Sequence, residues 1–181
     1  LDGQQRLTTM YLALRSGKPV NTRTEKGESI QRVYFLDMTR CLDPAGDREE
    51  AVISVPATLK QTSDFGRKVD LDLSTPELQY AQRLFPLFLM FDTEALMKWE
   101  MGYSQHYAGD SEAAMFLMKF KNAIWLVFQQ FKVPAIEMSV DTPREAVCQV
   151  FEKVNQGGVS LTVFELMTAT FAADEFQEEQ L

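Results

Sequence analysis

The sequence predicts an α+β fold that is mostly helical, in which a small sheet carries a large helical elaboration. Apolar residues recur at helical spacing in several long segments, whereas only short segments look like strands. The 181 residues are 45% hydrophobic and 24% charged, as in a globular domain. This length corresponds to about one domain. The chain begins Leu1-Asp2-Gly3 without an initiator Met, so we expect residues 1–181 to be a single, partial domain.

The first half of the chain predicts two helices around short strands. Residues 4–15 place Leu7, Met10, Tyr11 and Leu14 on one helical face, and Gly17 ends that helix. Ser74-Thr75-Pro76-Glu77 opens the second helix, with proline at its first position and a carboxylate in its first turn. Strands are predicted at 33–36 and 53–55, and loops at 18–28, 41–50 and 63–73.

The second half predicts longer helices. Pro86 interrupts an apolar segment, so a loop is expected before a helix that starts near Thr93. A long core helix is predicted from Ser111, with a wide apolar stripe. The stripe consists of Phe116, Leu117, Phe120, Ile124, Val127, Phe128 and Phe131. The alternation in 133–140 predicts a strand. A helix from Thr142-Pro143 to Asn155 is expected next, and Thr162 and Glu165 have capping-box spacing for one more.

Composition excludes several classes of function. A net charge of −8 argues against a broad phosphate-binding surface, although one arginine and backbone N–H groups can still hold a small anion. Two cysteines and one histidine, His106, are too few for a zinc site or a histidine-metal nuclease. There is no P-loop and no G-x-S-x-G. No apolar run is long enough to span a membrane and no signal peptide is visible, so we expect a cytoplasmic location.

The segment Asp2-Gly3-Gln4-Gln5-Arg6, just before a helix, has the chemistry of an anion site. Gly3 permits a ligand to approach the backbone closely, and free N–H groups at a helix start attract phosphate. Arg6 can bind phosphate oxygens through its guanidinium group. Asp2 can hold Mg²⁺ or orient a water, and Gln4 and Gln5 can position a water. The structural alternative is that Asp2 caps the helix and Arg6 is a solvated side chain.

A second cluster lies near the end of the chain, where Asn155 and the glycines after it turn the chain sharply. An ordinary helix–turn–helix corner explains the glycines, whereas a functional role would give Asn155 a hydrogen bond to a ligand or to the Asp2–Arg6 segment. A DNA-reading helix–turn–helix is rejected, because the second helix offers no Arg or Lys before Asp174.

These two segments carry a family resemblance. Leu1-Asp2-Gly3-Gln4-Gln5-Arg6-Leu7-Thr8-Thr9 closely resembles the DGQQR signature of the GmrSD-type restriction endonuclease N-terminal domain family. The corner Phe151-x-x-x-Asn155-x-x-Gly158-x-x-Leu161 resembles that family's second motif, in the same order along the chain. The resemblance implies a ParB/sulfiredoxin-like core, here without its N-terminal part, in which the DGQQR segment is a loop between a strand and a helix.

The resemblance also implies a function. The domain would bind and hydrolyse an NTP, GTP rather than ATP, with Mg²⁺, and so regulate a modification-dependent DNA restriction or phage-defence protein. Asp2, Gln5 and Arg6 would be catalytic, while Gly3, Gln4, Thr8, Thr9 and Asn155 would bind the nucleotide; the metal ligands are not assigned. The full-length protein would bind DNA, and its partner would be an HNH-type nuclease, either as a C-terminal domain or as a separate protein. The alternative is a non-catalytic ParB-like module for nucleotide sensing or DNA binding, with a local basic patch at Arg23, Lys26, Arg32 and Arg40.

Overall fold

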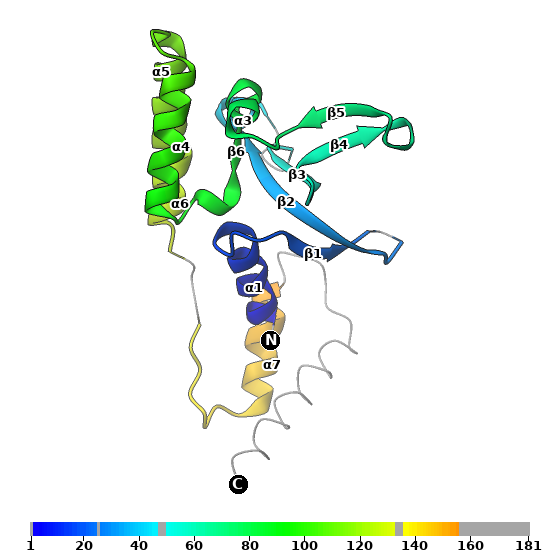
Figure 1. Cartoon of the computed structure of the whole chain (residues 1–181). Coiled ribbons are helices and arrows are strands. Elements are labelled where there is room, and N and C mark those ends of the chain that lie inside the picture. The colour runs from blue at the N-terminus through cyan, green and yellow to red at the C-terminus, as the bar shows by residue number, and fades with distance from the viewer. Residues whose placement is uncertain (1, 25, 47–49, 133–135, 156–181) are drawn as a thin grey trace. The chain divides into compact units, whose positions relative to one another are not determined.

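The computed structural model describes residues 2–24, 26–46, 50–132 and 136–155 (Figure 1). These residues belong to two units, a larger one of residues 2–131 and a smaller one within residues 132–181, and each is described by itself. None of the helices in the described ranges is both long and apolar enough to cross a membrane.

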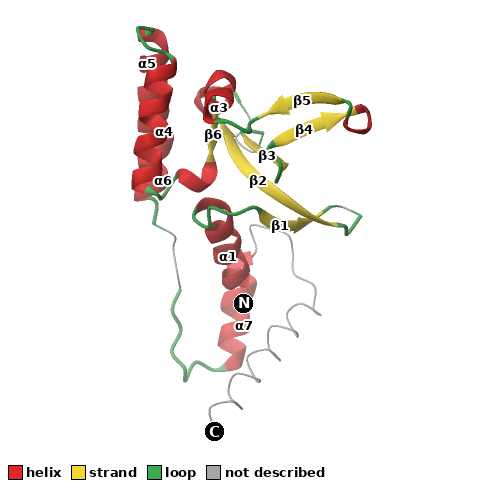
Figure 2. Cartoon of the chain, in the orientation of Figure 1, coloured by secondary structure: helices red, strands yellow, loops and turns green. Residues whose placement is uncertain are grey.

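The larger unit mixes helices with short strands, and helices predominate (Figure 2). Its strands are β1 (Val20–Arg23), β2 (Ser29–Asp37), β3 (Val52–Pro56), β4 (Lys60–Ser63), β5 (Lys68–Asp72) and β6 (Leu84–Pro86). Its α-helices are α1 (Asp2–Leu14), α2 (Met38–Leu42), α3 (Pro76–Gln82), α4 (Thr93–His106), α5 (Ser111–Phe120) and α6 (Leu126–Gln130). Shorter helical turns are η1 (Asp64–Gly66), η2 (Leu87–Leu89) and η3 (Lys121–Trp125).

Strand β2 is the centre of the main sheet, and all its partners are antiparallel. β3 lies along one edge of β2, and β1 and β6 lie along the other, because Arg32 is opposite both Val20 and Pro56 and Phe35 is opposite both Ile53 and Pro86. A separate two-stranded sheet is formed by β4 and β5. The predicted strands 33–36 and 53–55 are therefore confirmed within β2 and β3.

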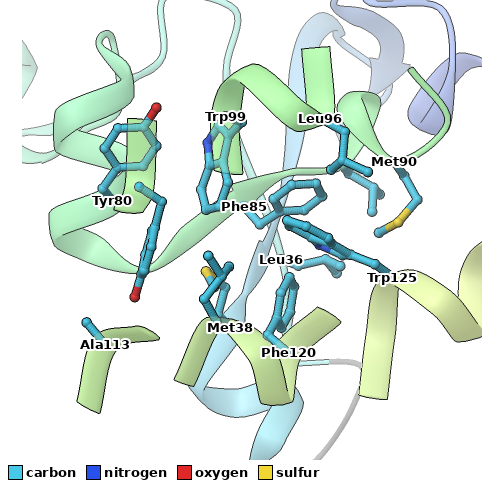
Figure 3. Close-up of a cluster of buried hydrophobic side chains, with 13 residues drawn as sticks. Leu36, Met38, Tyr80, Phe85, Met90, Leu96, Trp99, Ala113, Phe120 and Trp125 are labelled. Carbon is cyan, nitrogen blue, oxygen red and sulfur yellow. The ribbon is translucent and has the colours of Figure 1, made fainter. Parts of the chain in front are cut away.

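The apolar run of β2 is continuous because both faces of the strand are covered. Leu36 belongs to a large aromatic cluster that α3, α4, α5 and η3 complete (Figure 3). Val33 and Phe35 belong instead to a smaller cluster with Val55, Leu73 and Leu84.

Helices α4 and α5 form a hairpin whose starts are capped by aspartates. Asp92 accepts a hydrogen bond from the N–H of Ala95, and Asp110 accepts from the N–H groups of Glu112 and Ala113. Lys121 pairs with Glu100 across the hairpin.

The predicted long helix from Ser111 is interrupted by η3, which is a π-helical turn. A π turn adds one residue, so the buried face moves on by one position. Trp125 is accordingly buried, whereas Val127 and Phe131, which the unbroken stripe placed in the core, are exposed. The predicted stripe is thus wrong for Val127 and Phe131, whereas Ile124 and Phe128 pack against the large cluster as predicted.

Other local predictions have mixed outcomes. The helices at 4–15, from Pro76 and from Thr93 are confirmed, and Thr75 caps α3. The loop predicted at 18–28 contains β1, because pairing with β2 supplies partners for a polar segment. The strand predicted at 133–140 is wrong for the described residues 136–140, whose Ile136, Met138 and Val140 are exposed. The helix predicted after Thr162 lies outside the described residues.

The loop predicted at 63–73 is instead the hairpin of β4, η1 and β5. Its base is held by the N–H of Leu73, which donates to the Leu59 carbonyl over 2.8 Å, and by packing of Leu59 and Leu71 against the smaller cluster. Asp72 adds polar contacts at the same place: its carboxylate lies 2.9 Å from Lys60 Nζ and accepts hydrogen bonds from the Ser74 hydroxyl and N–H.

These contacts predict an acid-dependent loss of stability. The bonds from Lys60 and Ser74 lower the pKa of Asp72 to about 2. A lowered folded-state pKa contributes stability that is present above the ordinary carboxyl pKa and is lost as the pH falls through about 2. We expect Asp72→Asn to remove this part of the pH dependence, which urea unfolding between pH 6 and pH 2 would show. Asp70→Asn, which breaks the neighbouring Lys68–Asp70 pair, is the charge-matched control, and an equal change in both variants would contradict the prediction.

In the smaller unit the described element is α7 (Arg144–Asn155). It confirms the helix predicted from Thr142-Pro143 to Asn155. Its residues Ala146, Val147 and Val150 are half-buried, as their helical spacing predicts.

Candidate functional site

The Asp2–Arg6 segment is helical in the structure, because α1 begins at Asp2. The expectation of a loop ahead of the helix is therefore corrected. Glutamine, arginine and leucine are good helix formers, and a carboxylate in the first turn interacts favourably with the helix dipole. The segment forms the first turn of α1 and the start of the second, rather than a connection leading to it.

The helical backbone groups the predicted catalytic positions. Residues 2, 5, 6 and 9 are spaced i, i+3, i+4 and i+7, and positions with this spacing share one side of a helix. The side chains of residues 2–6 are outside the described part of the structure. Thr8 and Thr9 are described, and both are exposed. The first four N–H groups of a helix have no intrahelical partner, so the segment also provides backbone donors.

Helix α1 is fixed at its C-terminal end. Ala13 and Leu14 pack against the large aromatic cluster, and Arg15 Nη1 donates to the Phe91 carbonyl over 3.0 Å. The Ser16 hydroxyl donates to the Leu12 carbonyl, and Gly17 follows with a positive φ of 63°. The apolar face predicted for this helix is thus buried only in part, since Leu7 and Tyr11 are 56% and 58% exposed.

Asn155, the other predicted nucleotide-binding residue, is the last residue of α7. It belongs to the smaller unit, whereas Asp2–Arg6 belong to the larger one. Its association with the Asp2–Arg6 segment stays a prediction. The rest of the corner, including Gly158 and Leu161, lies outside the described residues.

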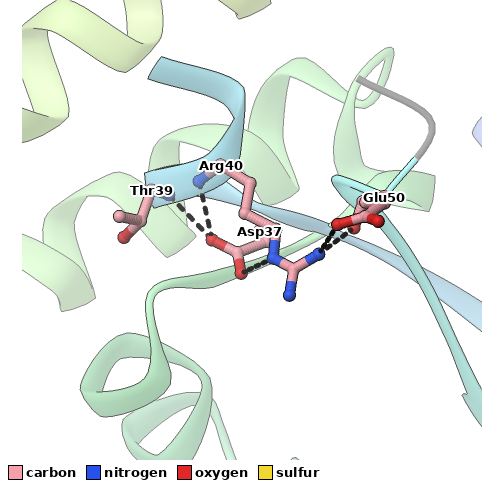
Figure 4. A network of polar contacts seen from close by, with 4 residues as sticks. All are labelled: Asp37, Thr39, Arg40 and Glu50. Carbon is pink, nitrogen blue, oxygen red and sulfur yellow. Dashed lines mark hydrogen bonds and ion pairs between the residues drawn. The ribbon is translucent and has the colours of Figure 1, made fainter. Parts of the chain in front are cut away.

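The basic patch predicted for the alternative function is smaller than the sequence indicates. Arg40 lies between two carboxylates: its Nη1 is 2.7 Å from Glu50 Oε2, and its Nε is 3.5 Å from Asp37 Oδ2 (Figure 4). Asp37 also caps α2 by accepting from the N–H groups of Thr39 and Arg40. The charge of Arg40 is therefore matched by acidic partners, and Arg32 is partly buried on β2. Arg23 and Lys26 are exposed on the β1–β2 hairpin.

A hollow of about 330 Å³ lies where α4 turns into α5, and sequence reasoning missed it. It is lined by Tyr103, Ser104, Tyr107, Gly109, Asp110, Ser111 and Ala114. Tyr103 is buried, and its hydroxyl has no hydrogen-bond partner in the structure. Burial is the main cause of its raised pKa. The available signal was the segment Tyr103-Ser-Gln-His-Tyr107, which combines aromatic and polar residues just before a helix N-cap.

His106 lies at the surface, as a lone histidine usually does. It is exposed in the last turn of α4, with its ring 5.7 Å from that of Tyr80 and 4.7 Å from that of Tyr107. Among the described residues, no group of three or more His, Cys, Asp and Glu side chains could hold a metal ion.

Comparison with known proteins places the chain in a family. An uncharacterized protein of Methanocaldococcus jannaschii is 24% identical over 175 residues, a match that covers 94% of this chain but 27% of that protein. The chain thus spans about a quarter of the length of this relative. No solved structure matches the chain. The N-terminal domain of the GmrSD restriction endonuclease matches residues 1–172, which include both motifs. The chain belongs to the GmrSD restriction endonuclease N-terminal domain family.

Proposed function

We propose that the chain is an NTP-binding and NTP-hydrolysing regulatory domain of a modification-dependent DNA restriction or phage-defence protein. Family membership supports the restriction role. The observation that carries the NTP assignment is the position of Asp2, Gln5 and Arg6 at the start of α1, spaced to share one side of the helix. Free N–H groups and a positive dipole end at such a helix start favour a phosphate.

The proposed roles follow from the chemistry of each side chain. Arg6 would neutralise the charge that develops on the transferred phosphoryl group. Asp2 would hold Mg²⁺ or orient the attacking water, and Gln5 would position that water. Carboxylate oxygens are ligands that Mg²⁺ accepts, so Asp2 fits this ion, which would shield the phosphate charge when bound. Gly3, Gln4, Thr8, Thr9 and Asn155 would contact the nucleotide, with GTP preferred over ATP.

Two wider proposals accompany this one. The sheet of β1, β2, β3 and β6, together with α1, would belong to a ParB/sulfiredoxin-like core. The full-length protein would act in the cytoplasm, where a C-terminal or separate HNH-type nuclease would cut DNA. The antiparallel sheet and its helical surroundings are compatible with such a core.

The test is Arg6→Ala in the full-length protein, with phosphate release measured for GTP and ATP, with and without DNA. We expect the variant to lose turnover by about two orders of magnitude or more and to keep its circular dichroism spectrum, because Arg6 would act mainly in the transition state. Lys18→Ala, which removes an exposed cation beyond the end of α1, is the control and should keep wild-type turnover. Unchanged turnover in Arg6→Ala would remove Arg6 from the proposed role.

A second candidate is a non-catalytic module that senses a nucleotide or binds DNA. The exposed cations Arg23 and Lys26 on the β1–β2 hairpin favour it. Nucleotide binding without phosphate release, in the same experiment, would support this candidate over hydrolysis.

A further inference from the structure

Arg83, the residue directly after α3, has a backbone conformation that arginine rarely adopts. Its φ of 53° and ψ of 41° lie in the left-handed region, and its N–H ends the helix by donating to the carbonyls of Gln79 and Tyr80. Glycine is the usual residue at such a position, because a side chain in the left-handed region costs energy. The backbone would be less strained with glycine, so the reason for an arginine at position 83 lies in its side chain.

The Arg83 side chain is half-buried beside aromatic rings rather than beside carboxylates. Its guanidinium carbon lies 4.3 Å from the centre of the Phe116 ring. Arg83 is also near Tyr103, because burial raises the pKa of Tyr103 and the Arg83 charge opposes that rise. Among the described residues, no Asp or Glu forms an ion pair with Arg83. The described part of the chain therefore leaves this positive charge available to an anion.

A hollow of about 300 Å³ opens beside this guanidinium. It is lined by Arg83, Glu112, Met115, Phe116 and Lys119, so α5 supplies one wall and the residue after α3 supplies the other. Within the described ranges, Lys119 and Glu112 form no ion pair, with each other or with Arg83. Two cations and one carboxylate give the lining a net positive charge, on a chain whose net charge is −8.

We propose that this hollow, the Arg83 pocket, binds a small organic anion in which a carboxylate or phosphate group is joined to an apolar body. Arg83 donates two parallel hydrogen bonds to the oxygens of the anion, and Lys119 adds a second positive charge. Met115 and Phe116 contact the apolar body, and the volume is at the lower end of the range for small-molecule sites. Glu112 repels the anion and so limits its affinity.

The test follows the methyl signal of Met115 by NMR in the full-length protein, isotope-labelled at its methionine methyl groups. Met115→Leu identifies the signal. We expect phenyl phosphate and benzoate to shift it in a saturable way, and the tighter of the two identifies the preferred anionic group. Met97, an exposed methionine outside the pocket, should not shift. The neutral analogue benzyl alcohol should bind about tenfold more weakly, because it cannot form charge-assisted hydrogen bonds with Arg83.

Three substitutions change the charge of the pocket in opposite directions. Arg83→Gly should weaken anion binding about tenfold or more and keep the wild-type urea midpoint, because glycine relieves the left-handed backbone. Lys119→Gln should weaken binding about threefold, whereas Glu112→Gln removes the carboxylate of the lining and should tighten binding about twofold. Lys18→Gln is the matched control, since it removes an exposed lysine outside the pocket and should bind like the wild type.

An unshifted Met115 signal with both anions would overturn the proposal. Equal affinity for benzyl alcohol would also overturn it, because the hollow would then be apolar only, and so would equal losses in Lys119→Gln and Lys18→Gln. If Arg83→Gly fails to fold, Arg83→Asn is the second variant, since asparagine tolerates the left-handed region, and unchanged affinity in it would contradict the role of Arg83. The pocket contains no residue of the Asp2–Arg6 segment, so these outcomes do not depend on NTP hydrolysis.

Discussion

Replacing Phe85 with alanine is expected to lower the free energy of unfolding by about 3–5 kcal/mol, the range for truncating a buried phenylalanine. Phe85 is completely buried on β6. Its ring centroid lies 5.1 Å from those of Trp99 and Trp125 and 5.7 Å from that of Phe120, so one side chain joins α4, α5 and η3 to the sheet. Urea unfolding followed by tryptophan fluorescence measures the loss, because Trp99 and Trp125 report directly on this cluster.

The chain contains a second phenylalanine, Phe65, that serves as a control for this substitution. Phe65→Ala removes an identical side chain from a fully exposed position and should change the free energy of unfolding by less than about 0.5 kcal/mol. The stability loss expected for Phe85→Ala is large enough to unfold a domain of ordinary stability. Phe85→Leu is therefore the second variant, and its free energy of unfolding should fall by less than that of the alanine variant. Equal losses at positions 85 and 65 would contradict the burial described for this cluster.

Gly102→Ala is expected to destabilise the protein by about 1–3 kcal/mol, although alanine is the better helix former. A Cβ at position 102 would lie 2.2 Å from the Tyr80 hydroxyl oxygen and 3.0 Å from the ring carbon that bears it. Tyr80 is buried and its ring packs edge-on against Trp99 at 5.1 Å, so it has little room to move away. This overpacking should exceed the gain of about 1 kcal/mol that alanine brings within a helix.

The double variant Tyr80→Phe/Gly102→Ala tests the cause. Without the hydroxyl the shortest contact disappears, so the cost of Gly102→Ala should be smaller in the Tyr80→Phe background, as urea midpoints of the four proteins would show. A stabilised Gly102→Ala protein would mean that Tyr80 and α4 are not packed as closely as the structure places them.

How much of the fold was predictable depends on whether the signal was local. The start of α3 follows from Thr75 and Pro76, and the start of α4 follows from residues near Thr93, because capping and helix initiation involve neighbours in sequence. The hairpin of β4 and β5 was missed because its strands are polar, exposed and stabilised by cross-strand contacts such as Lys60–Asp72. Such pairing has no apolar alternation for sequence reasoning to detect.

The residues assigned to the candidate site stay a prediction, and the structure tests only the backbone conformation of their segment. The residue types of the Asp2–Arg6 segment indicated anion chemistry, and family membership agrees with its signature. The resemblance implied a loop for this segment, whereas the apolar spacing predicted a helix from residue 4. The structure begins α1 at Asp2, because glutamine, arginine and leucine are good helix formers. The loss of Arg40 from the basic patch depended on Glu50, an acidic partner ten positions away that spacing alone does not pair with it.

The π turn of η3 constrains how this chain can vary in length. Because the π turn accommodates one extra residue, a chain one residue shorter in this segment would form a regular α-helix whose later residues keep their present direction. Gln129, whose side-chain amide donates to the Met90 carbonyl over 3.2 Å, would keep that direction after such a deletion, whereas a regular α-helix of unchanged length would turn it away by about 100°. Loss of a single residue within η3 should therefore be better tolerated than loss of a residue within α4 or α5.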